Sequence, residues 1–174
     1  MEVSLPMSNA PETTSGNPLH PKRAGSSVEA VVINAEPQLT FVDDSDAEWH
    51  DARTTGLFEP THERPFDGLC LVEVGTPVEI KATLPEHQNG ERTAPGRWYI
   101  KRPSHERLVD ANGVYHLNVY APRPSTPLLA SVVVAAATID DLLTGYWYQN
   151  RGRDVARLSW PRVIDENRVT GGGN

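Results

Sequence analysis

The chain has 174 residues, 38% of them hydrophobic and 22% charged, and its formal net charge is −7. This length is enough for one domain with its own hydrophobic core. The negative charge argues against a uniformly basic nucleic-acid binder, and no apolar run reaches the length of a membrane-spanning helix.

The first residues contain no basic region followed by an apolar segment, so we do not expect them to form a signal peptide. The single Cys70 cannot form an internal disulfide. It falls within a predicted strand, where we expect a buried thiol in a reducing compartment. The sequence therefore predicts an intracellular, cytoplasmic protein with no membrane partner.

Residues 1–27 are predicted to be a disordered arm, because they contain four prolines and few large apolar side chains. Residues 28–165 are predicted to form a single domain, and residues 166–174 a flexible tail. Within the domain, the apolar run 28–33 favours an edge strand. The capping-box pattern that starts at Ser45 predicts a short helix over about 46–55.

A β-hairpin is predicted next, with strands at 68–72 and 76–83 and a three-residue turn that ends at Gly75. Side chains alternate along a strand, so this turn length places Asp67, Glu79 and Lys81 on one face. Asp67 and Glu79 would then be diagonal neighbours, about 7–8 Å apart at Cα. A two-residue turn would instead put Asp67 on the opposite face.

The rest of the chain alternates between strands and short helices. A polar loop is expected over 85–95, and a strand over 97–101 with Trp98 and Ile100 in the core. Ser104 is a candidate cap for a helix that ends near Gly113. The segments that follow predict strands at 114–120 and 131–137, a short helix from 138 to about 145, and a strand at 154–160.

Asp67, Glu79 and Lys81 are the candidate catalytic residues. Two carboxylates can hold a hard divalent cation, and a neighbouring ammonium can orient a water molecule for attack on phosphorus. The chain contains only three lysines against thirteen arginines, which makes a lysine at this position informative. The alternative is an exposed strand face that carries an ordinary ion pair.

The predicted order of elements and the acid-x-Lys triplet resemble the core of the PD-(D/E)XK nuclease superfamily, over roughly residues 45–120. This family has a restriction-endonuclease-like fold, which archaeal Holliday-junction resolvases share. The resemblance implies an α/β (α+β) domain with a mixed central sheet in αβββαβ order, flanked by short helices. Asp67 matches the first acid of the motif, Glu79 the second acid, and Lys81 the lysine. Many members add a glutamate from the first helix, and Glu48, Glu59 and Glu63 all remain candidates for it.

The resemblance implies a metal-dependent nuclease that hydrolyses phosphodiester bonds, usually in DNA. Asp67, Glu79 and the main-chain carbonyl of Ile80 would bind Mg²⁺, with Mn²⁺ as an alternative, and Lys81 would position the attacking water. The substrate would be duplex or branched DNA, and members of the superfamily often act as homodimers. The alternative function is a catalytically inactive nucleic-acid-binding or assembly protein that keeps the fold.

Local basic segments offer contacts for a phosphate backbone in spite of the negative net charge. The candidates lie in a segment with a single acid, Glu106, and they are Arg97, Lys101, Arg102, His105 and Arg107. A second basic cluster comprises Arg151, Arg153, Arg157 and Arg162. The alternative for Arg97 and Lys101 is a solvated strand face, and for His105 a surface histidine with no role.

Overall fold

The computed structural model describes residues 21–46, 49–69, 71–121 and 127–170. Cys70, Glu48, most of the predicted arm and residues 171–174 lie outside these ranges. The helices of the described part are α1 (Pro21–Ala35), α2 (Arg102–Asp110), α3 (Ala136–Leu143), the 3-10 turn η1 (Trp160–Arg162) and α4 (Glu166–Thr170). None of the helices in these ranges combines the length and the apolar character that crossing a bilayer requires.

The main sheet has six strands in the order β1-β2-β4-β8-β9-β3. It is mixed, because β4 pairs with β8 and β3 pairs with β9 in parallel while the other pairs are antiparallel. Its strands are β1 (Leu39–Phe41), β2 (Ala52–Thr54), β3 (Phe66–Asp67), β4 (Pro77–Thr83), β8 (Val114–Tyr120) and β9 (Leu128–Ala135).

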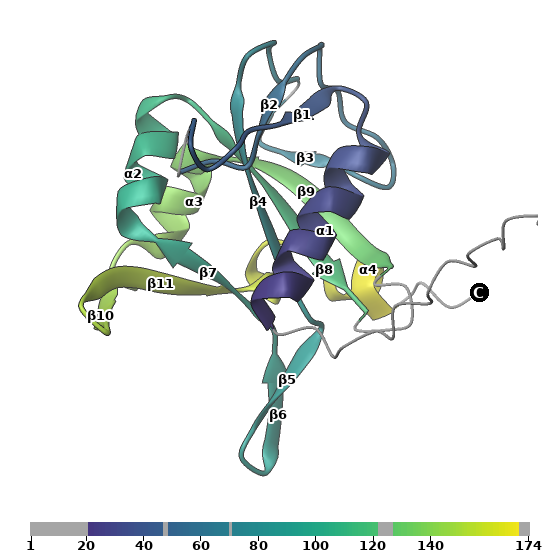
Figure 1. The fold of residues 1–174 in the computed structure, drawn as a ribbon. Coiled ribbons are helices and arrows are strands. Elements are labelled where there is room, and N and C mark those ends of the chain that lie inside the picture. The colour runs from purple at the N-terminus through teal and green to yellow at the C-terminus, as the bar shows by residue number, and fades with distance from the viewer. Residues whose placement is uncertain (1–20, 47–48, 70, 122–126, 171–174) are drawn as a thin grey trace, which may run out of the picture.

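Two smaller sheets complete the fold. A three-stranded sheet in the order β10-β11-β7 contains β10 (Tyr148–Asn150), β11 (Arg153–Ser159) and β7 (Arg97–Lys101). A separate hairpin of β5 (Glu86–Asn89) and β6 (Arg92–Pro95) projects from the body of the molecule (Figure 1). When β3 and the strands β5, β6 and β7 are set aside, the elements follow the order α1-β1-β2-β4-α2-β8, which is the αβββαβ order of a PD-(D/E)XK-like fold, so the predicted fold class is confirmed.

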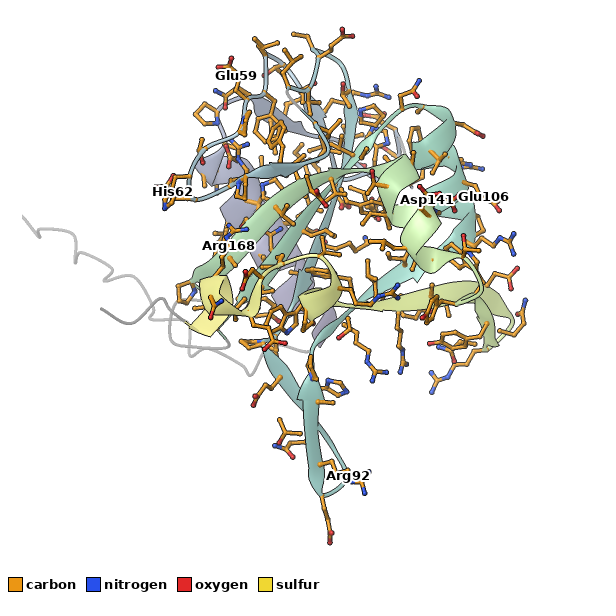
Figure 2. All side chains as sticks on the ribbon, turned by 180° about the vertical axis from the view of Figure 1, so that it is seen from behind. Glu59, His62, Arg92, Glu106, Asp141 and Arg168 are labelled. Atoms are coloured by element: carbon orange, nitrogen blue, oxygen red, sulfur yellow. The ribbon has the colours of Figure 1, made fainter. Side chains whose placement is uncertain are left out.

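The two faces of the main sheet pack against different layers. Helix α1 crosses one face (Figure 1), where Val28 and Val32 are fully buried against Val78, Ile80 and other apolar side chains. Helices α2 and α3 and the three-stranded sheet cover the opposite face. Glu106 on α2 and Asp141 on α3 lie on the solvent side of this second layer (Figure 2). Alternate residues of β4 therefore face two different cores.

Three predicted elements are wrong in the N-terminal half, namely the strand at 28–33, the helix at 46–55 and the β-hairpin. The run 28–33 is helical rather than extended, because Val28 and Val32 are one turn apart and bury the same face against the sheet. Helix α1 begins at Pro21, within the segment that was predicted to be part of the arm. The predicted helix at 46–55 is replaced by β2, whose Ala52 pairs with Val78 of β4.

The third wrong element is the predicted hairpin, in which only the β4 strand forms. Gly75 does take a left-handed conformation (φ 85°), but the turn that it makes connects to β2, since its N–H donates to the Thr54 carbonyl at 2.8 Å. Gly68, also left-handed (φ 69°), follows Asp67 at the end of β3. In the described part of the segment 68–72, which was predicted as the first strand, the only pairing is an isolated bridge between Val72 and Phe58.

Agreement is better in the C-terminal half. Strands β7, β8, β9 and β11 and helix α3 form within a few residues of their predicted positions, and Trp98 and Ile100 are buried as expected. Two details differ. The predicted polar loop at 85–95 is the β5–β6 hairpin. Helix α2 begins at Arg102, so Lys101 rather than Ser104 occupies the N-cap position, without a side-chain capping hydrogen bond.

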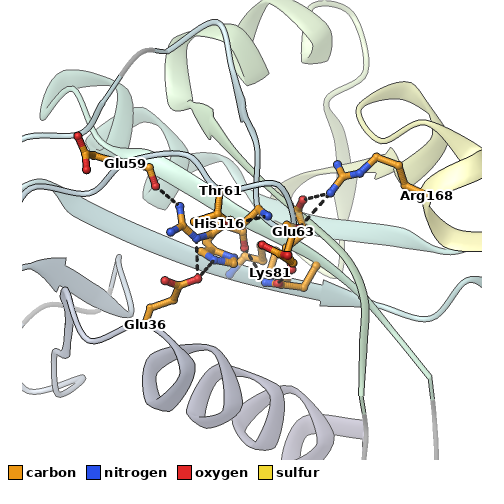
Figure 3. A network of polar contacts seen from close by, with 10 residues as sticks. Glu36, Glu59, Thr61, Glu63, Lys81, His116 and Arg168 are labelled. Atoms are coloured by element: carbon orange, nitrogen blue, oxygen red, sulfur yellow. Dashed lines mark hydrogen bonds and ion pairs between the residues drawn. The ribbon is translucent and has the colours of Figure 1, made fainter. Parts of the chain in front are cut away.

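His116 is a fully enclosed histidine on the α1 side of β8 (Figure 3). Neither ring nitrogen has a hydrogen-bond partner in the described part, and Nε2 lies 3.9 Å from Glu36 Oε1. Burial lowers the pKa of His116, and the nearby Glu36 carboxylate opposes this shift without overcoming it. The folded protein therefore holds His116 neutral at a pH at which the unfolded chain would bind a proton.

We expect His116→Leu to become progressively more stable than wild type as the pH falls below about 6.5. In that range residue 116 binds a proton in the unfolded wild-type chain but not in the folded one, so acid destabilises wild type by an amount that the leucine variant does not lose. A histidine that stays neutral in the folded state lowers the free energy of unfolding by about 1.4 kcal/mol per pH unit, or by about 2 kcal/mol between pH 6.5 and pH 5. Urea unfolding at pH 8, 6.5 and 5 measures the difference, and a pH-independent difference would contradict the account.

Candidate active site

The triplet Glu79-Ile80-Lys81 lies in the middle of β4, between β2 and β8. Glu79 and Lys81 point to the face opposite α1, because the intervening Ile80 belongs to the core under α1. Glu79 is 8% exposed, and its Oε1 accepts a charge-assisted hydrogen bond from the Lys81 ammonium. This part of the predicted site forms a partly buried ion pair on a central strand.

Asp51 joins this triplet from the residue immediately before β2. Its N–H donates to the Val78 carbonyl at 3.0 Å, and its Oδ2 accepts the N–H of Ile80 at 2.7 Å. These two bonds fix both the backbone and the carboxylate of Asp51 against β4. The structure therefore brings an acid at the start of one strand beside the acid-x-Lys triplet of the neighbouring strand.

The electrostatics of the cluster follow from its burial. Burial raises the pKa of Glu79 to about 7, with Asp51 adding to the rise and the Lys81 ammonium opposing it. Burial alone would lower the pKa of Lys81, but the carboxylates of Glu79, Asp51 and Glu29 outweigh it and raise that pKa. Lys81 is thus held as a cation among acids, one of which is close to its protonation midpoint at neutral pH.

We expect two substitutions to move the pKa of Glu79 in opposite directions. Lys81→Met removes the main charge that stabilises the Glu79 carboxylate and raises its pKa above about 7, whereas Asp51→Asn removes a repelling charge and lowers it. Carbon-detected NMR titration of the glutamate carboxyl groups in metal-free protein measures both shifts. Shifts of the same sign in the two variants would contradict this arrangement.

Glu29 adds a third carboxylate from α1. Burial raises its pKa, Asp51 raises it further, and Lys81 opposes the change, so Glu29 lies within electrostatic range of both. Glu29 and Asp51 also line the same hollow, of about 440 Å³, between α1 and the residues that follow β1. Glu29 is therefore a carboxylate from the first helix that lies close to Asp51.

The donor set suits a hard divalent cation. The described residues contain no group of three or more acidic, histidine or cysteine side chains that is close enough to hold a metal ion by itself. Asp51 and Glu79 offer two carboxylates, and the Ile80 carbonyl points toward Asp51, because a strand residue directs its N–H and C=O to the same edge. Mg²⁺ typically takes only one or two carboxylates and fills its other positions with water and substrate phosphate, so these donors fit it.

Asp67 does not belong to this cluster. It is exposed in β3, at the far edge of the main sheet, and strands β8 and β9 separate β3 from β4. Three strand spacings correspond to about 14 Å, which is too far for Asp67 and Glu79 to share one ion. The predicted convergence of Asp67 with Glu79 and Lys81 is wrong, because β4 takes β2 rather than the segment after Asp67 as its antiparallel partner.

The remaining glutamate candidates have other surroundings. Glu59 and Glu63 are exposed in the segment between β2 and β3, where their main-chain carbonyls accept hydrogen bonds from Arg64 and Arg168 respectively (Figure 3). Glu48 lies outside the described residues. Glu29 is thus the glutamate that the described structure associates with Asp51.

The predicted phosphate-binding residues separate into exposed and buried groups. Arg97, Lys101 and Arg107 are exposed, and Arg102 is exposed but paired with Glu106 at 2.9 Å. His105, in contrast, is 1% exposed, with Nδ1 2.9 Å from the Tyr115 hydroxyl and Nε2 3.1 Å from Asp140 Oδ1. His105 is a core histidine and cannot reach a phosphate backbone, because its position on α2 faces the main sheet.

Sequence reasoning missed Asp51 and Glu29, although each left a signal. Asp51 precedes Ala52-Arg53-Thr54-Thr55, a short segment with two threonines, which favour strands. Glu29 directly follows Val28, which is one helical turn before Val32. The capping-box pattern at Ser45 instead predicted a helix that includes Asp51, and the β-branched composition of residues 28–33 predicted a strand that includes Glu29.

The comparison with protein families agrees with this geometry. A family model described as PD-(D/E)XK nuclease superfamily domain matches residues 15–165, a range that contains Glu29, Asp51, Glu79 and Lys81. No curated protein and no solved structure matches the chain significantly. The mixed sheet, the acid before β2 and the acid-x-Lys triplet of β4 agree with a family match that covers most of the chain. The chain therefore belongs to the PD-(D/E)XK nuclease superfamily.

Proposed function

We propose that the protein is a metal-dependent nuclease that hydrolyses phosphodiester bonds in DNA. The observation that carries the proposal is the double hydrogen bonding of Asp51 to β4, which holds its carboxylate beside Glu79-Ile80-Lys81. An acid, a second acid and a lysine at these positions form the motif that gives the superfamily its name. Asp51 replaces Asp67 as the first acid of that motif.

Asp51, Glu79 and the Ile80 carbonyl would hold the ion, which we propose to be Mg²⁺, with Mn²⁺ as a substitute. When bound, a divalent ion polarises a phosphoryl oxygen and lowers the pKa of a coordinated water molecule. Glu29 would add a further carboxylate from α1, either to the ion or through its water. The strands hold these donors in place before substrate arrives, which is what rapid chemistry requires.

Lys81 would act on the reacting groups directly. The surrounding carboxylates keep its ammonium protonated, so it is suited to donate hydrogen bonds rather than to accept a proton. Its position beside Glu79 allows it to orient the attacking water and to stabilise the negative charge that develops on the phosphate. We assign Lys81 this electrostatic role and not that of a general base.

Substrate would approach along exposed cations. Arg97, Lys101 and Arg107 are free to contact phosphates, and the exposed pair of Arg102 with Glu106 is weak enough to exchange for a phosphate contact. We propose duplex or branched DNA inside the cell as the substrate. Cutting both strands would require two chains, so a homodimer on the substrate is part of the proposal.

Cleavage of supercoiled plasmid and of a branched DNA tests this function. Wild-type protein with Mg²⁺ or Mn²⁺ is expected to nick both, whereas a chelator or Lys81→Ala abolishes the activity. Folding of the variant is checked by its melting curve. Binding of DNA without cleavage by well-folded wild type, under low and high salt, would contradict the nuclease and favour a catalytically inactive DNA-binding protein.

A further inference from the structure

The three-stranded sheet has an outer face that turns away from the core. Its inner face carries Trp98, Ile100, Ala156 and Leu158, all of which belong to the core beneath the main sheet. Because side chains alternate, the intervening residues point outward. The strand register places Tyr99 directly opposite Arg157, and Asn150 directly opposite Arg153, on this outer face.

The outer face is strongly basic. The residues that the register assigns to it are Arg97, Tyr99, Lys101, Tyr148, Asn150, Arg153, Val155, Arg157 and Ser159. Four of these nine are cations and none is an acid, in a chain whose net charge is −7. The acid of β11, Asp154, lies on the other face and bonds to Gln149. Within the described ranges none of the four cations forms an ion pair, so their charge is available to a ligand.

The face is also concave. A hollow of about 510 Å³ is lined by Tyr99, Asn150, Arg151, Arg153 and Arg157. Arg151 reaches it from the β10–β11 turn, where it takes a left-handed conformation (φ 50°). Three arginines thus surround a half-buried tyrosine ring in a space of the size that small ligands and single nucleotides occupy.

We propose that this hollow binds an unpaired nucleotide of a single-stranded nucleic-acid segment. Arg151, Arg153 and Arg157 would contact successive phosphates, and a base would stack on Tyr99. The proposal rests on the proposed function for its ligand class, because it makes this surface part of the substrate path. Stacking on Tyr99 needs an exposed base face, which a continuous duplex does not offer, so the site would favour single-stranded segments such as the arms or flaps of branched DNA.

Fluorescence anisotropy with a labelled 20-nucleotide single strand and the matching duplex, in chelator to prevent cleavage, tests the site. We expect Tyr99→Leu to weaken single-strand binding by about 5-fold to 100-fold, while Tyr99→Phe, which keeps the ring, binds like wild type. We expect Arg157→Gln to weaken binding and to reduce the slope of log K against log salt by about 0.7 for the single strand.

The matched control is Arg92→Gln, which removes the same charge at the tip of the β5–β6 hairpin, away from β10 and β11 (Figure 2). Equal losses in Arg157→Gln and Arg92→Gln, or an unchanged affinity in well-folded Tyr99→Leu, would overturn the proposal. A loss of duplex binding in Tyr99→Leu as large as its loss of single-strand binding would also overturn it.

The same proteins separate this proposal from the nuclease. If wild type cleaves DNA but the Tyr99 and Arg157 variants bind the single strand as wild type does, the proposal for the hollow is refuted and the proposed nuclease function stands. If single-strand binding depends on Tyr99 and Arg157 but wild type cleaves no DNA, the proposal for the hollow is supported and the proposed nuclease function is refuted.

Discussion

Asp51→Asn is expected to lower metal-dependent DNA cleavage by about 10²–10⁴-fold. A metal ion contributes several kcal/mol of stabilisation to a phosphoryl transition state, and each 1.36 kcal/mol corresponds to a factor of ten in rate. The asparagine side-chain oxygen can still accept the Ile80 N–H, so the fold should survive the change. Initial rates on supercoiled plasmid with saturating Mg²⁺ measure the effect.

Asp67→Asn is the matched control for this experiment, because it makes the same chemical change at the far edge of the sheet. Its cleavage rate should equal that of wild type. Loss of cleavage in Asp67→Asn with retention in Asp51→Asn would restore the assignment made from the sequence and would refute the one made from the structure. Thermal melting of both variants confirms that each is folded.

Arg64→Ala is expected to lower the free energy of unfolding by about 3 kcal/mol, and the melting temperature by about 6–12 °C. Arg64 is 6% exposed, bonds to Glu36 Oε1 at 2.5 Å and to the Glu59 carbonyl at 2.9 Å, and lies 4.0 Å from the centroid of the Phe58 ring. Removing it leaves the partly buried Glu36 carboxylate without its main countercharge. Urea unfolding at pH 7 measures the loss.

Arg92→Ala, at an exposed position, should change stability by no more than about 0.5 kcal/mol. Glu36→Gln should cost less than Arg64→Ala, since the Glu36 side chain is more exposed (17% against 8%) and the neutral amide can still accept a hydrogen bond from Arg64. An Arg64→Ala effect as small as that of Arg92→Ala would show that the ion pair and the contact of Arg64 with the Phe58 ring do not stabilise this region.

The ion pair of Arg64 with Glu36 also supports the position of the candidate active site. It connects the segment between β2 and β4 to the end of α1, the helix that carries Glu29. Burial alone would raise the pKa of Glu36, but the neighbouring His116 and Arg64 outweigh it, so the pKa is lowered and Glu36 stays charged. The contact therefore helps to fix α1 against the sheet on which Asp51 and Glu79 lie.

The fold class was predictable because the C-terminal half has clear periodicity. The alternation of Trp98 and Ile100 with polar neighbours identified β7, and the apolar run ending near Ala137 identified β9. The predictions for the N-terminal half were wrong because the local secondary-structure preferences of its residues disagree with their tertiary packing. The β-branched residues at 28–33 favour a strand on their own, but Val28 and Val32 gain more by packing as one helical face on the sheet.

The site was only partly predictable for a topological reason. Glu79 and Lys81 are two residues apart on one strand, so their pairing follows from local geometry. The first acid must come from a strand that is adjacent in space, and the partner of β4 is β2, which the 22-residue stretch 55–76 separates from it in sequence. Asp67 lies within that stretch and close to β4 in sequence, whereas the sheet places it on the opposite edge. Pairing of strands that are distant in sequence leaves little local signal.

The assignment of Asp51 and Glu79 as the acids of the metal site is tested most directly by Mn²⁺ binding. Electron paramagnetic resonance would follow this binding in wild type, Asp51→Asn and Asp67→Asn. We expect saturable Mn²⁺ binding in wild type and in Asp67→Asn, and binding weakened at least about tenfold in Asp51→Asn, because we propose Asp51 and not Asp67 as a ligand. Unchanged binding in folded Asp51→Asn, or binding lost in Asp67→Asn, would contradict the assignment of Asp51 and Glu79 as the acids of the metal site.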